Sequence, residues 1–358
     1  MNTGLLRRFA VGRTLLLGAV LALTVPGTAY ANTMSVTVKT PGATSGPATS
    51  NSEISTHADC SGGLISGGGI NQAIGTGGSV NGNHVNGTAP SSDGATEYTG
   101  STGVVGTDVT HWLGIGGSGG QVNASFSSTP YAVCFTSNLI NHTQVVMNKA
   151  NTPTTGATVG LVVATCPANT RLIGGGARTT PGNTGSFKTI ASFPTFNNSA
   201  HDFGQKAAAN GETNPDSWAA VGWDSSTNSA NTTYAYAICS GNGINVSGAT
   251  VTVRNSEVSG PTSGSTGQTA TVGCGGGDGN LVSGGAAISG GSVTTTDFTV
   301  PGSGGDHLNG SFPSTSGGAA VSDGATTVAY WTAAAHTGGQ SSPGTYTDVW
   351  ALCANDGV

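Results

Sequence analysis

Six cysteines are the residues with the clearest chemistry, because thiols either pair as disulfides or bind metal ions. They are Cys60, Cys134, Cys166, Cys239, Cys274 and Cys353. No two of them stand in the Cys-x-x-Cys spacing that is typical of zinc sites. We therefore expect disulfides, with no metal site and no cofactor.

Two histidines are candidate ligand-binding residues because they occupy matching segments, His84-Val-Asn-Gly and His307-Leu-Asn-Gly. An imidazole beside a turn could contact a ligand. The alternative is a histidine that is hydrogen-bonded within its own turn, and the sequence favours this second interpretation.

Four tryptophans could offer an apolar face to a sugar ring. Trp112, Trp218 and Trp331 occur at similar places in the chain, and we expect them to pack in the core, because a β-sandwich usually buries one tryptophan against its disulfide. Trp223 has no such counterpart, and we expect it to be exposed. Trp223 is therefore the first candidate for contact with a glycan.

Catalytic motifs are represented only by short glycine-rich matches. Gly116-Gly-Ser118-Gly-Gly120 fits the Gly-x-Ser-x-Gly pattern of a serine nucleophile, but that motif needs a helix after the serine and no helical pattern follows. Carboxylates are sparse, and no pair stands out for the two-carboxylate chemistry of glycosidases. We therefore expect no catalytic residue and no enzymatic activity.

The cysteines belong to a repeat that occurs three times. The opening cysteines lie 106 and 108 residues apart and precede Leu64-Ile-Ser-Gly-Gly, Leu172-Ile-Gly-Gly-Gly and Leu281-Val-Ser-Gly-Gly. The closing cysteines end Tyr131-Ala-Val-Cys, Tyr236-Ala-Ile-Cys and Trp350-Ala-Leu-Cys. The repeats predict modules at 32–138, 139–243 and 244–358. The simplest pairing joins the two cysteines of each module, Cys60–Cys134, Cys166–Cys239 and Cys274–Cys353.

Strand-like alternation is found in every module. In Tyr234-Ala-Tyr-Ala-Ile-Cys239, small residues and the cysteine share one face and bulky residues share the other, as in a strand buried between two layers. Glycine fills 61 of 358 positions, and Asn-Gly and Asp-Gly pairs supply turns. The sequence therefore predicts an all-β protein of three tandem antiparallel β-sandwich modules. Short connecting segments leave the arrangement of the modules open.

The second module carries Cys166-Pro-Ala-Asn-Thr-Arg-Leu-Ile-Gly-Gly-Gly-Ala, then Ser192-Phe-Pro, Trp218 and Tyr234-Ala-Tyr-Ala-Ile-Cys239. This order resembles a β-rich module that recurs in secreted proteins of high-GC Gram-positive bacteria. Modules 1 and 3 keep the cysteines, the glycines and the aromatic-Ala-x-Cys end, but they lack the proline after the first cysteine. The resemblance implies export and repetition, and it carries over no catalytic residue.

The first 31 residues have the pattern of a secretory signal peptide. Arg7, Arg8 and Arg13 precede an apolar run at 14–25, and Ala29-Tyr-Ala31 suits cleavage. Removing this segment leaves seven basic and sixteen acidic residues, a formal net charge of −9. Such a balance disfavours nucleic acid and anionic membranes as partners. We expect a secreted, extracellular protein without a membrane span, in an oxidising environment that allows disulfides.

Tandem repetition, few ionisable groups and the lack of a catalytic constellation favour an extracellular structural or adhesive role. The alternative is polysaccharide binding through exposed aromatic residues, with glycans or cell-surface components as partners. A secreted hydrolase is the third hypothesis. For the adhesive role, an array of three modules gives avidity even to weak sites. Self-association is a further expectation.

Overall fold

The computed structural model describes Met1 and residues 33–74, 82–121, 125–154, 158–226, 230–241 and 246–357. The predicted signal peptide, residues 1–31, lies outside these residues apart from Met1. Regular structure in the described part is almost entirely antiparallel strand, with one 3-10 helix described in full, η2 (Ser199–Gly204). The predicted all-β class is confirmed. No helix of this part is long and apolar enough to cross a bilayer.

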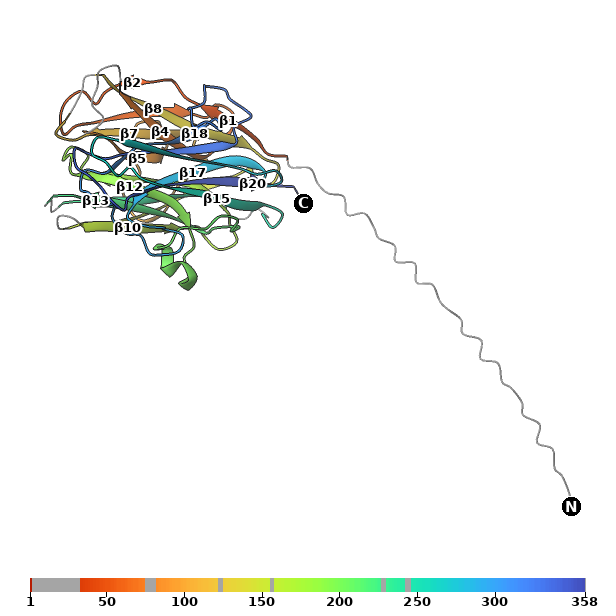
Figure 1. Cartoon of the computed structure of the whole chain (residues 1–358). Coiled ribbons are helices and arrows are strands. Elements are labelled where there is room, and N and C mark those ends of the chain that lie inside the picture. The colour runs from red at the N-terminus through yellow and green to blue at the C-terminus, as the bar shows by residue number, and fades with distance from the viewer. Residues whose placement is uncertain are drawn as a thin grey trace.

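The strands follow one another in a similar order in the three modules (Figure 1). Module 1 contains β1 (Ser35–Lys39), β2 (Thr44–Ser45), β3 (Glu53–Asp59), β4 (Leu64–Ile74), β5 (Asn83–Ser91), β6 (Gly103–Thr107), β7 (His111–Ser118) and β8 (Phe126–Thr136). Module 2 contains β9 (Thr143–Ala150), β10 (Thr158–Thr165), β11 (Leu172–Thr180), β12 (Phe187–Thr195), β13 (Ser217–Asp224) and β14 (Thr232–Ser240). Module 3 contains β15 (Thr250–Ser259), β16 (Gly267–Gly273), β17 (Asn280–Ser289), β18 (His307–Ser314), β19 (Tyr330–His336) and β20 (Tyr346–Asn355).

Each module has two layers of three core strands that pack face to face, as the sequence predicts for a sandwich. Two further strands of module 1 extend closing layers: β2 pairs with β8, and β6 pairs with β9 of module 2. One layer, called here the closing layer, has the strand with the closing cysteine at its centre: β1–β8–β4, β9–β14–β11 and β15–β20–β17. The other, called here the tryptophan layer, is centred on the strand that carries Trp112, Trp218 or Trp331: β3–β7–β5, β10–β13–β12 and β16–β19–β18.

The predicted disulfides are confirmed, one within each module. They are Cys60–Cys134, Cys166–Cys239 and Cys274–Cys353, with Cα–Cα distances of 5.5, 5.7 and 5.7 Å. Each opening cysteine follows the edge strand of a tryptophan layer, and each closing cysteine lies in a closing layer. Every bridge therefore ties the two layers of its own sandwich. Three such bridges indicate that the chain folds in an oxidising compartment.

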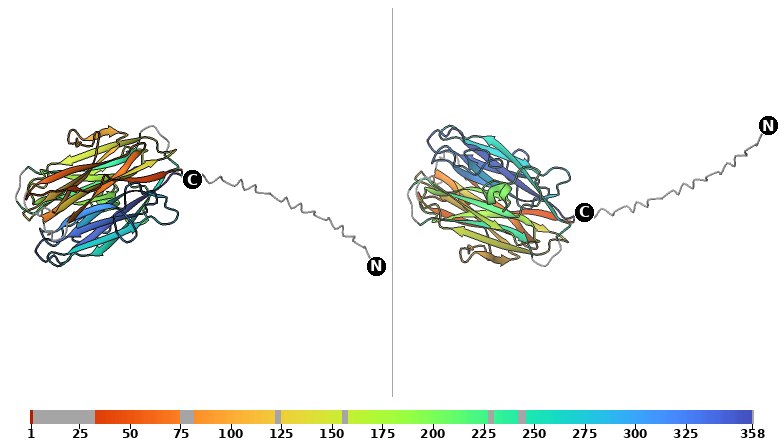
Figure 2. Two further views of the ribbon diagram at one scale, coloured as in Figure 1. Left: turned by 90° about the horizontal axis from the view of Figure 1, so that it is seen from above. Right: turned by 90° about the horizontal axis from the view of Figure 1, so that it is seen from below.

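The modules share sheets and form a closed ring. The tryptophan layer of one module continues edge to edge into the closing layer of the next, through β5–β11, β12–β17 and β18–β4. The last of these pairs returns from module 3 to module 1. Figure 2 accordingly shows the blue strands of the last module beside the red and orange strands of the first.

Two neighbouring glycines in each closing layer allow two close contacts, one between the layers of a module and one between modules. A Cβ on Gly68, Gly175 or Gly284 would overlap the indole of the module's own tryptophan, Trp112, Trp218 or Trp331. A Cβ on the next residue, Gly69, Gly176 or Gly285, would overlap a carbonyl oxygen of the neighbouring module, that of Ser311, Thr88 or Ser192. The first glycine makes room for the core of its module, and the second makes room for the joint between modules.

Strand register also corrects the sequence alignment of module 1. Ile65, Leu172 and Leu281 each stand opposite the closing cysteine of their module. Ile65, and not Leu64, is therefore the counterpart of Leu172. Four residues separate Cys60 from Ile65, whereas five separate Cys166 from Leu172, and Leu64-Ile65 imitates the pair Leu172-Ile173 one position early.

Polar contacts fasten the ring at two further places. Arg178 of module 2 is 3% exposed and binds two carboxylates of module 1, Glu53 at 2.9 Å and Glu97 at 2.8 Å. Near the chain ends, Asp356 accepts hydrogen bonds from the backbone N–H of Thr33 at 2.7 Å and from the Ser137 hydroxyl at 2.5 Å. Hydrogen bonds outweigh burial and lower the pKa of Asp356 below its ordinary value.

We predict that Gly175→Ala destabilises the protein by about 3 kcal/mol, because the new methyl group must displace the Trp218 ring in a packed core. Urea unfolding followed by tryptophan fluorescence measures the loss. Gly100→Ala is the matched control, since a Cβ there meets no atom within 4 Å. Equal stabilities of the two variants would contradict the packing described above.

Candidate functional site

The structure places all four candidate tryptophans in the interior. Trp112, Trp218 and Trp331 are fully buried, as expected. The Nε1–H groups of Trp218 and Trp331 donate to the hydroxyls of Ser192 and Ser311 at 2.8 and 2.9 Å. The indole rings are therefore fixed core elements, and their faces are not accessible to a sugar ring.

The expectation that Trp223 is exposed is wrong, because only 4% of this residue is accessible. Trp223 stands opposite Lys188 in the β12–β13 register, and the Lys188 ammonium lies 5.4 Å from the centre of its ring. The same ammonium donates to the carbonyl of Gly304 at 2.9 Å. Gly304 belongs to module 3, so this module helps to hold Lys188 over the Trp223 ring. The sequence suggested an exposed ring only because Trp223 has no counterpart in the other modules.

His84 and His307 come from different modules and are brought together, with 6.5 Å between their ring centres. Both are buried, and His336 lies 5.6 Å from His307. Lys188 is the module 2 counterpart of the two histidines, since all three stand six residues before the matching prolines of β5, β12 and β18. We call His84, Lys188, His307 and His336 the central basic cluster. Counting back from these prolines would have revealed Lys188 in the sequence.

Hydrogen bonds define which ring nitrogen carries the proton in this cluster. Nδ1 of His84 and Nδ1 of His307 face the carbonyl oxygens of Gly82 and Gly305 at 3.2 and 2.7 Å. A carbonyl oxygen only accepts, so both rings donate from Nδ1. These bonds match the alternative that the sequence favoured, a histidine held within its own turn.

Burial disfavours the protonated form of each group in the central basic cluster, and it does so most strongly for the histidines. Burial lowers the pKa of His84 to about 3, and the Lys188 charge adds to this effect. The same two causes hold the pKa of His307 well below its ordinary value. Burial also lowers the pKa of Lys188 to about 8, although Asp306 and Asp224 partly oppose the change.

We predict that acid destabilises the protein through these histidines. Above the unfolded-state pKa of 6.5 the rings are neutral in both states, and their contribution to stability is complete. As the pH falls below 6.5, both imidazoles bind protons in the unfolded chain but stay neutral in the folded protein. The free energy of unfolding should then fall by about 1.4 kcal/mol per pH unit for each ring. Urea unfolding between pH 7.5 and pH 5 measures this slope.

His84→Asn and His307→Asn should each reduce the slope, because asparagine does not titrate and can donate to the same carbonyl group. His142→Asn is the control, since the His142 side chain is 62% exposed. An unchanged slope in the buried variants would show that other groups cause the acid sensitivity.

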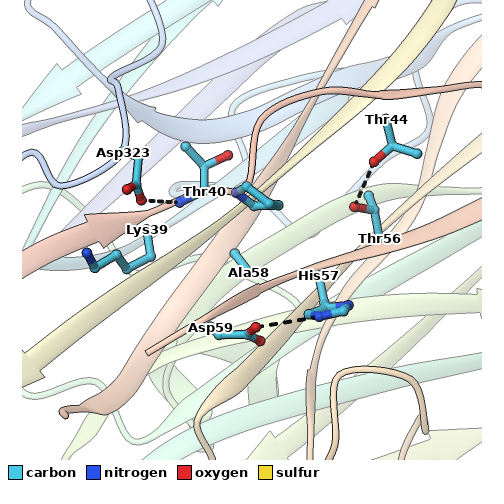
Figure 3. A pocket seen from close by; sticks show the side chains of 9 residues that line it. Lys39, Thr40, Thr44, Thr56, His57, Ala58, Asp59 and Asp323 are labelled. Atoms are coloured by element: carbon cyan, nitrogen blue, oxygen red, sulfur yellow. Dashed lines mark hydrogen bonds and ion pairs between the residues drawn. The ribbon is translucent and has the colours of Figure 1, made fainter. Parts of the chain in front are cut away.

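A polar pocket of about 400 Å³ lies at the edge of module 1 (Figure 3). It is lined by Lys39, Thr40, Pro41, Thr44, Thr56, His57, Ala58, Asp59 and Asp323. Lys39 ends β1, Thr44 belongs to β2, and 56–59 belong to β3. The pocket therefore lies between strands of the closing layer and the edge strand of the tryptophan layer. Asp323 reaches it from module 3 and accepts a hydrogen bond from the backbone N–H of Thr40 at 3.0 Å.

The imidazole and hydroxyl groups of this pocket are held by their neighbours. Alternation along β3 puts His57 and Asp59 on one face, 3.5 Å apart, and strand pairing puts His111 opposite Asp59, with Nδ1 at 2.5 Å from its carboxylate. The hydroxyls of Thr44 and Thr56 lie 3.4 Å apart. About half of the His57 and Asp59 side chains is exposed. The pocket thus presents both donors and acceptors to solvent.

The pocket offers hydrogen bonding. Among the described residues, no group of three or more His, Cys, Asp or Glu side chains is arranged to hold a metal ion.

Ser118 of the glycine-rich Gly-x-Ser-x-Gly match ends β7, and its hydroxyl donates to the carbonyl of Thr49 at 2.6 Å. Of the residues that follow it, the described ones, 119–121, end in a bend and do not begin the helix that the nucleophile motif requires.

No protein-family model matches this sequence, and a search of curated proteins gave no match.

Proposed function

We propose that the chain is an exported extracellular protein with a structural or adhesive role and without catalytic activity. The observation that carries this proposal is the closed ring, in which module 3 pairs with module 1 through β18 and β4. In a ring of this kind, each module is held at both of its sheet edges by neighbours. Local opening of one module then requires breaking contacts with two others, which favours persistence outside the cell.

The disulfides support the same role. Each closes a loop of 73 to 79 residues and lowers the entropy of the unfolded chain. This effect stabilises the folded protein by up to about 4 kcal/mol per bridge. This contribution is comparable to the net stability of a whole domain. A chain that is rich in glycine, and that loses more backbone entropy on folding, gains most from such bridges.

We predict that purified protein starting at Asn32 binds to bacterial cell walls or to itself, and that the binding survives about 1 M NaCl. Few charges are available for ionic contacts, so hydrogen bonds and apolar contacts should dominate, and salt screens these little. Co-sedimentation with purified cell walls and sedimentation velocity without them measure the two forms of binding. A protein that remains monomeric and unbound in both assays would contradict the structural role.

Glycan binding is the second candidate, and the module 1 pocket is the observation that favours it. The buried tryptophans do not supply a platform, but the pocket carries hydroxyl, imidazole, ammonium and carboxylate groups at a solvent-facing edge. Such a mixture of donors and acceptors suits the hydroxyl groups of a sugar. Pockets that orient a ligand by a few polar groups commonly have volumes of this order.

If this second role holds, His57→Ala and Thr44→Val should each weaken binding to insoluble polysaccharides about tenfold, because each removes a group that lines the pocket. His142→Ala, a surface histidine outside the pocket, should leave binding unchanged. Depletion assays with a panel of polysaccharides provide the affinities. Equal affinities for all three variants and the wild type would remove the pocket from consideration.

A further inference from the structure

Phe203 is held in an exposed position at the tip of a projecting turn. It lies in η2, between β12 and β13, and 61% of its surface is accessible. Figure 1 shows this green turn standing out from the body below β10. An exposed phenylalanine forgoes the stabilisation that burial of its ring would give. Its exposure leaves the ring available to a partner.

The backbone at this turn is strained and well supported. Asp202 and Phe203 both have positive φ, 44° and 53°, although neither is glycine. The Asn198 side chain accepts hydrogen bonds from the N–H groups of Ala200 and His201 at 3.0 and 3.1 Å. Strain of this kind persists only where the surroundings enforce it, and it gathers at functional sites.

Contacts at the base of the turn hold its backbone in this conformation. His201 lies 3.0 Å from the Glu212 carboxylate and packs on Phe196, with 4.6 Å between ring centres. The backbone N–H of Phe298 donates to the carbonyl of Gln205 at 3.0 Å. The Phe203 ring is therefore presented by a base that is fixed before any partner arrives, which lowers the entropic cost of binding.

An apolar pocket suited to such a ring lies on module 1. It measures about 370 Å³ and is lined by Gly62, Gly63, Leu64, Phe135, Thr136, Ser137, Ile140 and Asn141. A second hollow shares four of these residues, Gly62, Gly63, Phe135 and Thr136, and is also lined by Lys39. The pocket thus combines an apolar floor with an ammonium group nearby.

We infer that the Phe203 turn of one copy of this chain docks into the Leu64–Phe135 pocket of a second copy. The ring fills the apolar pocket, and the exposed Asp202 carboxylate beside it faces Lys39 in the adjoining hollow. The contact therefore pairs an apolar ring with an apolar pocket and a carboxylate with an ammonium group. The inference rests on the proposed structural role and names its partner as the protein itself.

The position of the two surfaces determines the kind of assembly. The turn lies at the bottom of the body in Figure 1, whereas β8, which carries Phe135, lies near the top. A copy therefore cannot fill its own pocket and leaves one turn and one pocket free after each contact. Such a heterologous contact, unless it closes into a ring, continues into a chain of molecules.

Sedimentation velocity over about 1–100 µM tests the inference, a range that covers weak protein contacts. Wild-type protein should form larger species as the concentration rises. Phe203→Asn should weaken association by about thirtyfold or more, as expected for loss of a central aromatic anchor. Asparagine tolerates a positive φ, so this variant should keep the wild-type melting temperature. A purely structural role for Phe203 would instead lower that temperature.

A mixing experiment identifies the pocket. Asn141→Trp places a large side chain at the exposed rim of the pocket and leaves the Phe203 turn intact. Each variant alone should be monomeric, whereas an equimolar mixture should form a 1:1 dimer and nothing larger, because only one turn and one pocket remain. Val104→Asn, which alters another apolar residue that is 51% exposed, should associate like wild type.

Association of Phe203→Asn at wild-type strength, or failure of the mixture to form dimers, would overturn the inference. A monomeric wild-type protein that still binds cell walls would also overturn it, but the proposed structural role would remain. A monomeric protein that binds nothing would remove both.

Discussion

The close contact between an indole ring and a glycine is the constraint on which the rest of the molecule depends. In each module a tryptophan of one layer lies where the Cβ of a closing-layer glycine would be, as Trp218 does over Gly175. This contact sets the spacing of the two layers. The next residue, Gly176 in module 2, lets a strand of module 1 approach, so the same short segment also fixes the joint between modules. Core packing and ring closure are therefore coupled through two adjacent residues.

Ring closure explains why polar and charged groups lie in the interior. The three joints bring His84, Lys188 and His307 together, and each comes from a different module. Buried imidazoles remain neutral and donate to turn carbonyls, while Lys188 donates to the carbonyl of Gly304. The two Nδ1–H groups and the ammonium, which are satisfied in this way, cost little at neutral pH and help to specify one arrangement of the modules. They also make that arrangement sensitive to acid.

Much of the fold follows from the sequence, because a repeat with paired cysteines constrains each module locally. Cys166 and Cys239 pair as the spacing predicts, and the alternation of Tyr234–Cys239 matches a strand between two layers. The joints between modules could not be predicted. The three joints that close the ring rest on two paired positions each, such as Ala177 opposite Thr88, and β6 of module 1 adds four pairs with β9 of module 2. A sequence repeated three times does not show which copies pair.

The candidate site was harder to predict, since its residues depend on the joints. Trp223 has no counterpart, which suggested exposure, but Lys188 lies over its ring. Lys188 itself was missed because it differs in type from His84 and His307. The module 1 pocket combines Asp323 of module 3 with strands of module 1, a proximity that only ring closure creates. Phe203 gave no signal in the sequence, because its exposure results from the local turn.

Differential scanning calorimetry of the oxidised protein tests most directly whether the three modules form one interlocked body. Modules that share every sheet should unfold together, in a single transition whose van't Hoff and calorimetric enthalpies have a ratio of about one. Separate transitions, or a calorimetric enthalpy about three times the van't Hoff value, would mean that the modules unfold independently. That result would contradict the closed ring.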